Sequence, residues 1–426
     1  MSDQGRIAGY RCEDQAEYCC PGEKIAVSRA VHLGRLAEFH SPCRQCRHRD
    51  DRALLSARRG RQLAESWQPP RPRPLFGEEG AAGVSWNELG PAEARRMAVA
   101  LGVWLREGLA AAERPPVAVV AGDGRSMMPE LVAAVAEGLR FAGCHVIEIG
   151  PATAACMASA IHVTEADGGI LIGNPGREAR TVGLKFWGAG GRPVSAGGPL
   201  ERIRELFHAG SDRPTRRFGS MRRFPAEDHY LATLATYFHA LRPLRVVVET
   251  GSPAALRSLE TLCARVACRI FPGRVSGVHP AAAIREPAAH FAIRIEDDGE
   301  RAALWDERGR AVACQRWFLL LAGSLLSEQP GRAVVLERGW PPSVAEAVRA
   351  MGGCPVWGDA LRAQMDQAMR AHRAVLGGGP SGRFWYSVSE GHASADALRT
   401  VTLVLTILSQ SDRPLSEVLD AATRPE

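Results

Sequence analysis

The sequence contains no hydrophobic run long enough to cross a membrane. Its 426 residues are 46% hydrophobic and 23% charged, but no stretch approaches the roughly 18 uninterrupted apolar residues of a membrane span. The N-terminus also lacks the basic and then apolar arrangement of a secretory signal peptide. We therefore expect a cytoplasmic protein, and the length allows two to four domains.

Aromatic residues are few, at 6%, and they do not interleave with the arginine-rich segments at residues 58–61 and 71–73. The net charge of +6 comes mostly from scattered arginines. Such a distribution favours solubility and a mild attraction to phosphorylated ligands. It argues against a nucleic-acid groove.

The eleven cysteines are unevenly distributed. Five of them lie near the N-terminus: Cys12, Cys19, Cys20, Cys43 and Cys46. In a cytosolic chain such a cluster is more typical of a metal site than of disulfides. Cys43 and Cys46 form one CxxC pair, and Cys20 and Cys12 can complete a Zn²⁺ site, with nearby histidines as alternatives to Cys12. The second pair is imperfect, so reduced cysteines without metal remain the alternative.

A proline-rich spacer follows this cysteine-rich segment. If zinc binds, residues 1–52 form a zinc-ribbon-like module with too little apolar content to fold without the metal. Residues 53–67 are expected to be helical, and the prolines within residues 69–74 favour an extended chain. We therefore predict a helical and proline-rich linker over residues 53–74.

Strand and helix patterns alternate through the rest of the chain. Residues 91–109 and 129–139 show the spacing of amphipathic helices. Short apolar runs typical of buried strands occur at residues 117–120, 145–149, 169–172, 244–248, 291–295, 333–336 and 374–376. The pattern restarts twice, which indicates three α/β units with mostly parallel sheets. Loops after the strands, where such sheets bind ligands, lie at residues 173–182, 296–301 and 377–382.

The loop after the strand at residues 291–295 carries carboxylates at alternate positions, Glu296, Asp298 and Glu300. Three oxygen donors with this spacing can converge on one hard divalent cation. Mg²⁺ is such a cation, and it prefers carboxylates together with a substrate phosphate. For this segment alone, a solvated acidic turn is the alternative.

Motifs distributed over residues 75–420 resemble those of a single family. They are Leu75-Phe76-Gly77 to Gly83, Gly122-Asp123-Gly124-Arg125, Gly168 to Ile172, Gly183-Leu184-Lys185, Glu296 to Arg301 and Gly377 to Gly382. With them the chain resembles the α-D-phosphohexomutases, the phosphoglucomutase and phosphomannomutase family. The resemblance implies three consecutive α/β/α phosphohexomutase-type domains with mixed, mostly parallel sheets, preceded by the small Cys-rich module. We expect these domains at residues 75–215, 216–312 and 313–426.

The resemblance also implies a chemistry, in which a phosphorylated serine exchanges its phosphate with a hexose phosphate through a bisphosphorylated sugar, assisted by Mg²⁺. The metal loop of the family falls on Glu296, Asp298 and Glu300. Substrate-binding positions of the family fall on Arg125, Lys185, Arg301 and Ser381.

Several family residues are missing. The phosphoserine position falls on Pro175, the loop histidine on Gly176 and the sugar-gripping glutamate on Gly379. Proline carries no nucleophile, so we predict no catalytic residue. Without a phosphoserine ligand the Mg²⁺ site is expected to be weaker. The chain also leaves no room for the fourth family domain, which is expected to be absent.

These departures predict a catalytically degenerate phosphohexomutase homologue of carbohydrate metabolism that binds a sugar phosphate or a partner. One alternative is an active intramolecular phosphotransferase on hexose phosphates, with Thr181, Asp298 or Ser381 as a substitute nucleophile. A second alternative is a scaffold whose N-terminal module contacts another protein or a nucleic acid.

Overall fold

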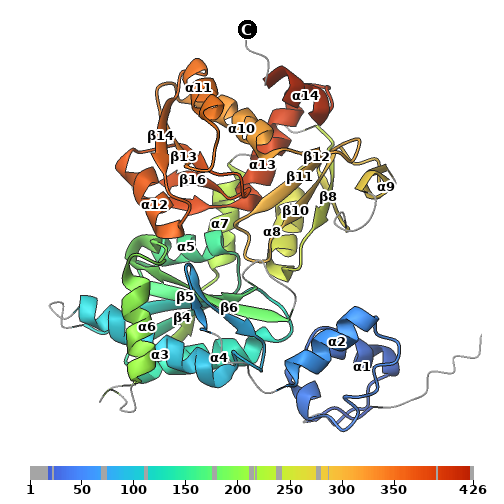
Figure 1. The fold of residues 1–426 in the computed structure, drawn as a ribbon, viewed down its shortest axis with the longest axis vertical. Helices are drawn as coiled ribbons and strands as arrows, with labels where there is room; N and C mark the ends of the chain where they lie inside the picture. The colour runs from blue at the N-terminus through green and yellow to red at the C-terminus, as the bar shows by residue number, and fades with distance from the viewer. Residues whose placement is uncertain are drawn as a thin grey trace, which may run out of the picture.

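The structure is a computed structural model in which three α/β units follow a small helical segment in chain order (Figure 1). None of its described helices is both long and apolar enough to cross a membrane. The described residues are 18–21, 24–68, 74–109, 114–174, 180–210, 215, 218–236, 242–274, 280–285, 287–389 and 392–422.

The N-terminal segment is helical. Ser28 and Ser56 accept hydrogen bonds at the starts of its two α-helices, as N-cap residues do. The helices share one apolar cluster with the first α/β unit, to which they contribute Leu36 and Leu63. An isolated bridge joins Tyr18 and Val27, and the predicted ribbon-like module is not confirmed. The elements are α1 (Arg29–Ala37), η1 (Ser41–Gln45) and α2 (Ala57–Ser66).

The first sheet has seven strands in the order β1-β2-β6-β5-β3-β4-β7. Its centre is parallel, whereas β1, β2 and β6 run antiparallel to their neighbours. The strands are β1 (Phe76–Gly77), β2 (Gly80–Val84), β3 (Val117–Gly122), β4 (His145–Pro151), β5 (Gly168–Gly173), β6 (Thr181–Gly188) and β7 (Met221–Arg223). Because β7 pairs with β4, this sheet extends beyond residue 215; the domain limits themselves remain predictions.

Helices cover both faces of this sheet, as alternation along a strand requires. Val120 of β3 packs in the cluster that contains residues of α3, α4 and α6, whereas its neighbour Val119 packs in the cluster that contains α5 and α7. The helices are α3 (Pro91–Gly108), α4 (Met128–Phe141), α5 (Ala154–Val163), η2 (Ala189–Gly191), α6 (Pro199–Ala209) and α7 (Ala226–Ala235).

The second sheet has five strands in the order β12-β11-β10-β8-β9. Its strands are β8 (Arg245–Glu249), β9 (Arg269–Pro272), β10 (Phe291–Ile295), β11 (Ala302–Asp306) and β12 (Ala311–Val312). Strand β10 is parallel to β8 and antiparallel to β11, so the loop between β10 and β11 turns at one end of the sheet. Its helices are α8 (Pro253–Cys263) and α9 (Pro280–Arg285).

The third sheet has five strands in the order β14-β13-β15-β16-β17. They are β13 (Ala333–Glu337), β14 (Cys354–Gly358), β15 (Leu376–Gly378), β16 (Phe384–Ser389) and β17 (His392–Ala395). The accompanying helices are α10 (Cys314–Glu328), α11 (Pro342–Ala350), α12 (Arg362–Ala371), α13 (Ala397–Ser409) and α14 (Leu415–Ala422). The predicted architecture of three consecutive α/β/α units is confirmed.

Candidate functional site

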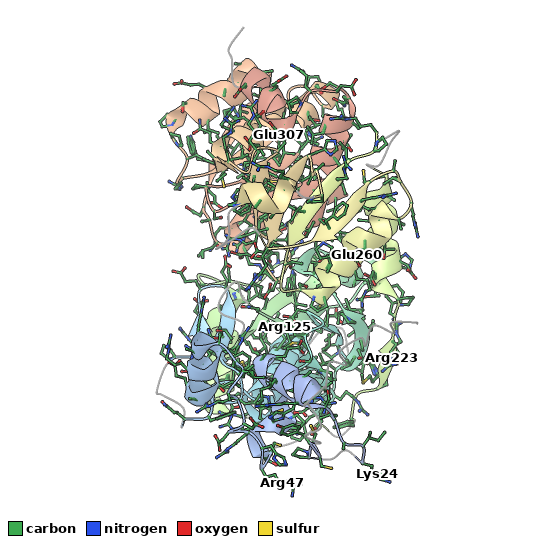
Figure 2. The ribbon with its side chains drawn as sticks, turned by 90° about the vertical axis from the view of Figure 1, so that its right-hand side faces the viewer. Lys24, Arg47, Arg125, Arg223, Glu260 and Glu307 are labelled. Carbon is green, nitrogen blue, oxygen red and sulfur yellow. The ribbon has the colours of Figure 1, made fainter. Side chains whose placement is uncertain are left out.

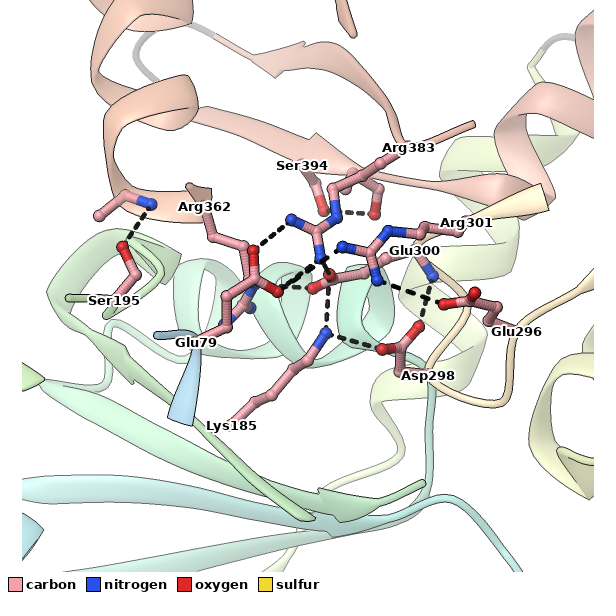
Figure 3. A network of polar contacts seen from close by, with 12 residues as sticks. Glu79, Lys185, Ser195, Glu296, Asp298, Glu300, Arg301, Arg362, Arg383 and Ser394 are labelled. Atoms are coloured by element: carbon pink, nitrogen blue, oxygen red, sulfur yellow. Dashed lines mark hydrogen bonds and ion pairs between the residues drawn. The ribbon is translucent and has the colours of Figure 1, made fainter. Parts of the chain in front are cut away.

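A buried group of charged side chains lies where the three sheets meet (Figure 3). Lys185, on β6 of the first sheet, donates hydrogen bonds from Nζ to Asp298 Oδ2 at 2.7 Å and to Glu300 Oε2 at 2.8 Å. Both carboxylates belong to the loop between β10 and β11 of the second sheet. Lys185 thus joins the first two units through a single ammonium group.

The third unit supplies two arginines to the same group. Nε of Arg362, the first residue of α12, lies 2.8 Å from Glu300 Oε1. Nη2 of Arg383, just before β16, lies 3.3 Å from Glu300 Oε2, and the same guanidinium binds both oxygens of Glu79 in the β1–β2 turn. We call Glu79, Lys185, Asp298, Glu300, Arg362 and Arg383 the central ionic cluster. Except for Glu79, its members are at most 7% exposed.

Local backbone geometry holds the β10–β11 loop in place. Gly299 has a positive φ of 77°, which favours glycine, and a Cβ at this position would lie 2.8 Å from the side chain of Thr153. The side-chain Oδ1 of Asp298 accepts a hydrogen bond from the backbone N of Glu300. The backbone carbonyl of Asp298 accepts a second one from the backbone N of Ala154, at the start of α5. The loop is therefore fixed against the first unit.

The cluster keeps the carboxylates of Glu300 and Glu79 charged. Burial alone would raise the pKa of Glu300, but Arg362, Lys185 and Arg383 outweigh it and hold that pKa far below its usual range. Burial acts in the same way on Glu79, whose pKa Arg383 nevertheless lowers. Buried carboxylates stay ionised only when cations and hydrogen bonds offset the loss of water, and here the protein itself supplies those cations.

The predicted Mg²⁺ ligands Glu296, Asp298 and Glu300 do not fit a divalent cation in this arrangement. The ammonium of Lys185 lies between Asp298 and Glu300. Glu296 pairs with Arg301, whose Nη1 is 3.4 Å from Glu296 Oε2. Within the described part of the chain, no three histidine, cysteine, aspartate or glutamate side chains are grouped to hold a metal ion. A cation would have to displace the lysine.

A pocket of about 420 Å³ opens beside the central ionic cluster. This volume lies within the usual range of small-molecule sites. Three of the four predicted substrate-binding residues, Lys185, Arg301 and Ser381, line it. Its other charged lining residues are Glu78, Glu79, Glu337 and Arg383.

Arg125, the fourth predicted substrate-binding residue, is not among the lining residues of this pocket. Its Nε donates to Asp123 Oδ2 at 2.7 Å and its Nη1 to the Thr181 carbonyl at 3.2 Å. Asp123 also accepts a bond from the backbone of Asn174. These residues flank positions 175–179, which lie outside the described residues. The assignment of the phosphoserine position to Pro175 therefore remains a prediction from sequence.

The predicted zinc ligands gain no support. Cys20, Cys43 and Cys46 are buried, but the Cys20 sulfur accepts a hydrogen bond from Arg35 Nη1 at 2.9 Å. The Cys46 sulfur accepts one from the backbone N of His48. Cys12 lies outside the described residues. No metal-holding group is found among the described cysteines and histidines.

Sequence reasoning did not identify five charged residues of this region: Glu78, Glu79, Glu337, Arg362 and Arg383. Glu79 and Arg383 are 304 positions apart in the chain, so no local pattern relates them. Glu79 does lie within one segment that carries the family resemblance, Leu75 to Gly83, and Arg383 directly follows another, Gly377 to Gly382. A search for charges beside those loops could have found these two, whereas nothing local marks Arg362.

Comparisons with known proteins agree with this architecture. Residues 73–213 match the family "Phosphoglucomutase/phosphomannomutase, alpha/beta/alpha domain I". A phosphomannomutase of Salmonella montevideo is 26% identical over 299 residues, which are 64% of this chain and 66%, just under two thirds, of that protein. A phosphohexose mutase of Xanthomonas campestris pv. campestris is 28% identical over 355 residues, 79% of this chain and 77% of that one.

A solved structure shares the fold. The phosphoglucomutase/phosphomannomutase family protein of Burkholderia thailandensis superimposes with a TM-score of 0.73 at 23% identity, covering 82% of this chain and 80% of that one. Over residues 73–213 the chain thus matches domain I of the phosphoglucomutase/phosphomannomutase family, and over most of its length it is similar to curated mutases and shares the fold of the Burkholderia protein.

Proposed function

We propose that this chain is a phosphohexomutase homologue of carbohydrate metabolism that binds a hexose phosphate in the pocket beside the central ionic cluster and no longer transfers phosphate. The observation that carries the proposal is the pairing of Asp298 and Glu300 with Lys185. The carboxylates that would face a metal face a protein cation instead. The names of the relatives, phosphomannomutase and phosphohexose mutase, support the ligand class.

Arg301 is the lining cation best suited to the phosphate. Its Nη1 and Nη2 lie 3.4 Å from Glu296 Oε2 and 3.9 Å from Glu79 Oε2, longer than the 2.7 Å and 2.8 Å bonds of Lys185. A guanidinium held this loosely can turn toward a ligand, and its planar fork matches a phosphate with two parallel hydrogen bonds. The hydroxyl of Ser381, exposed in the same pocket, can contact the sugar.

The positions of the substitute nucleophiles support binding over catalysis. Covalent phosphoryl transfer needs a nucleophile next to the substrate. Neither Thr181 nor Asp298 is among the lining residues of the pocket, and Asp298 is bound to Lys185. Ser381 lines the pocket, but no described base is hydrogen-bonded to its hydroxyl, and a serine without such a base is a weak nucleophile.

Calorimetric titration tests the binding. Glucose 1-phosphate and mannose 1-phosphate should bind the wild-type chain, and free glucose should bind far more weakly. Arg301→Gln should weaken the binding of the hexose phosphate about 10- to 100-fold, since a hydrogen bond to a charged group contributes about 1.5–3 kcal/mol. Arg308→Gln, an exposed arginine of the β11–β12 turn, is the matched control and should bind normally.

A turnover assay separates this proposal from the phosphotransferase alternative. We expect no conversion of hexose 1-phosphate to hexose 6-phosphate with Mg²⁺ and a glucose 1,6-bisphosphate primer. Turnover that survives repurification and disappears in Asp298→Ala would replace the proposal with an active mutase. Absence of binding by every hexose phosphate tested would instead favour a scaffold.

A further inference from the structure

In the pocket, the side chain of Glu337 lies directly beside Gly379. Glu337 ends strand β13, and Gly379 follows strand β15, its neighbour in the third sheet. A Cβ built on Gly379 would lie 1.6 Å from Glu337 Oε2 and 1.9 Å from its Cδ. The Glu337 carboxylate therefore occupies the space into which any side chain at position 379 would project.

The Glu337 carboxylate has no partner within the described part of the protein. Its residue is 5% exposed, and neither a hydrogen bond nor an ion pair joins its carboxylate to a described side chain or backbone group. It nevertheless lines the pocket together with Arg301, Ser381 and Arg383. Buried carboxylates are costly without donors, so this one is suited to take its donors from a ligand.

We infer that Glu337 is the group that accepts hydrogen bonds from the sugar hydroxyls of the ligand, in the space that Gly379 leaves free. The inference rests on the proposed function. A carboxylate offers two acceptor oxygens and no donor when ionised, which suits two neighbouring hydroxyls of a hexose. Arg301 on the phosphate and Glu337 on the hydroxyls divide recognition between opposite charges.

Burial supports this assignment chemically. It raises the pKa of Glu337, although Arg383 and Arg301 oppose the rise. Hydroxyl groups that donate to the ionised carboxylate stabilise its charged form and replace the water that burial removes. A site built to accept hydrogen bonds discriminates strongly against ligands that lack the donor, because its buried acceptor is then unpaired.

A first experiment changes the carboxylate without changing its shape. Calorimetric titration of mannose 1-phosphate, or of glucose 1-phosphate if that binds more tightly, should give at least tenfold weaker binding for Glu337→Gln. Inorganic phosphate, which carries no sugar hydroxyls, should bind the variant and the wild-type chain equally. Glu346→Gln, an exposed glutamate of α11 in the same unit, is the control and should behave as wild type.

A second experiment displaces the carboxylate and leaves Glu337 in the sequence. Gly379→Ala puts a methyl group where the carboxylate lies, and the flexible end of Glu337 should move away at little cost in stability. Binding should fall about as far as in Glu337→Ala. In the Glu337→Ala background, Gly379→Ala should have no further effect, because coupled residues give non-additive changes. The double variant Glu337→Ala with Gly379→Glu should recover part of the affinity.

The outcomes separate the two proposals. Tight binding by the wild-type chain that Glu337→Gln and Gly379→Ala both leave unchanged would overturn the role of Glu337 and keep the proposed function. Equal losses for hexose phosphate and inorganic phosphate would also overturn it, because the carboxylate would then act on the phosphate site. No hexose phosphate binding by the wild-type chain would overturn both proposals. Thermal melts confirm that each variant is folded.

Discussion

Lys185 is one of only two lysines among the 53 lysines and arginines of the chain; the other is Lys24. Its ammonium is compact and sits at the end of a flexible stem, so it can bridge two carboxylates that do not share a plane. Asp298 and Glu300 are such a pair, on one loop but two residues apart. An arginine in this position would favour one carboxylate and is not equivalent.

His392 gives the protein a pH-dependent stability. The ring is 3% exposed and stacks on His162 of α5 with 5.2 Å between ring centroids. Burial and the neighbouring charges of His162 and Arg370 lower its pKa to about 4, against a small opposing effect of the Gly190 backbone. The neutral ring is thus the form that fits the fold.

The lowered pKa of His392 should make the protein less stable as the pH falls below 6.5. Between pH 6.5 and about 4 the unfolded chain binds a proton that the folded His392 does not. The stability from the neutral ring is therefore complete above pH 6.5 and is lost as the pH falls toward about 4. The loss amounts to about 3 kcal/mol. Urea unfolding from pH 7.5 to 4 should show a flatter dependence in His392→Asn; parallel curves would contradict the assignment.

At the scale of elements, the contact between helices α3 and α4 depends on a glycine. A Cβ on Gly138 of α4 would lie 2.4 Å from the carbonyl oxygen of Arg95 and 2.9 Å from the Cβ of Ala98, both on α3. The nearest atom belongs to the backbone, which cannot move as a side chain can. The two helix axes are therefore as close as glycine allows.

Gly138→Ala should lower the free energy of unfolding by about 1–3 kcal/mol, as overpacking of a close contact does. Gly108→Ala is the control. This residue ends α3 and is exposed, and a methyl group added to it would meet no atom within 4 Å. Alanine there should stabilise by up to about 1 kcal/mol through helix propensity. Thermal melts compare the two variants, and equal shifts would refute the packing argument.

Periodicity predicted some elements and missed others. The runs at residues 117–120 and 291–295 were correctly assigned to strands because β3 and β10 are short, apolar and buried. Helix α5 gave no such signal, since most of its residues are buried. An amphipathic pattern requires one face in water, and this helix lies between layers of the protein.

At the scale of the whole molecule, the central ionic cluster joins the three sheets. Glu79 and Lys185 come from the first unit, Asp298 and Glu300 from the second, and Arg362 and Arg383 from the third. Arg362 also lies over the ring of Trp187, 4.4 Å from its centroid. Figure 2 shows the molecule from the side, with the first unit below the second and third units.

Lys185→Met should destabilise the whole molecule. Removing one partner from a buried ion pair costs about 3–5 kcal/mol, because the carboxylates left behind are uncompensated. Urea unfolding should have a lower midpoint. The tryptophan fluorescence and circular dichroism transitions should also separate, since the units lose a common anchor.

The matched control for Lys185→Met is Arg202→Met. Arg202 pairs with Glu107 at the surface, where both side chains are nearly half exposed, and surface pairs contribute little. If the urea midpoint of Lys185→Met differs from that of the wild-type protein no more than the midpoint of Arg202→Met does, the central ionic cluster has no structural role.

The sequence by itself determined the alternation of strands and helices in three α/β units, the family resemblance and three lining residues of the pocket, Lys185, Arg301 and Ser381. Each depends on neighbours in the chain, through side-chain alternation or a short motif. Only the tertiary structure decided which charges meet. Glu79 reaches Arg383, and Glu337 fills the space of Gly379, because folding brings distant strands to one edge. The partner of a buried charge is set by packing, which no local pattern records.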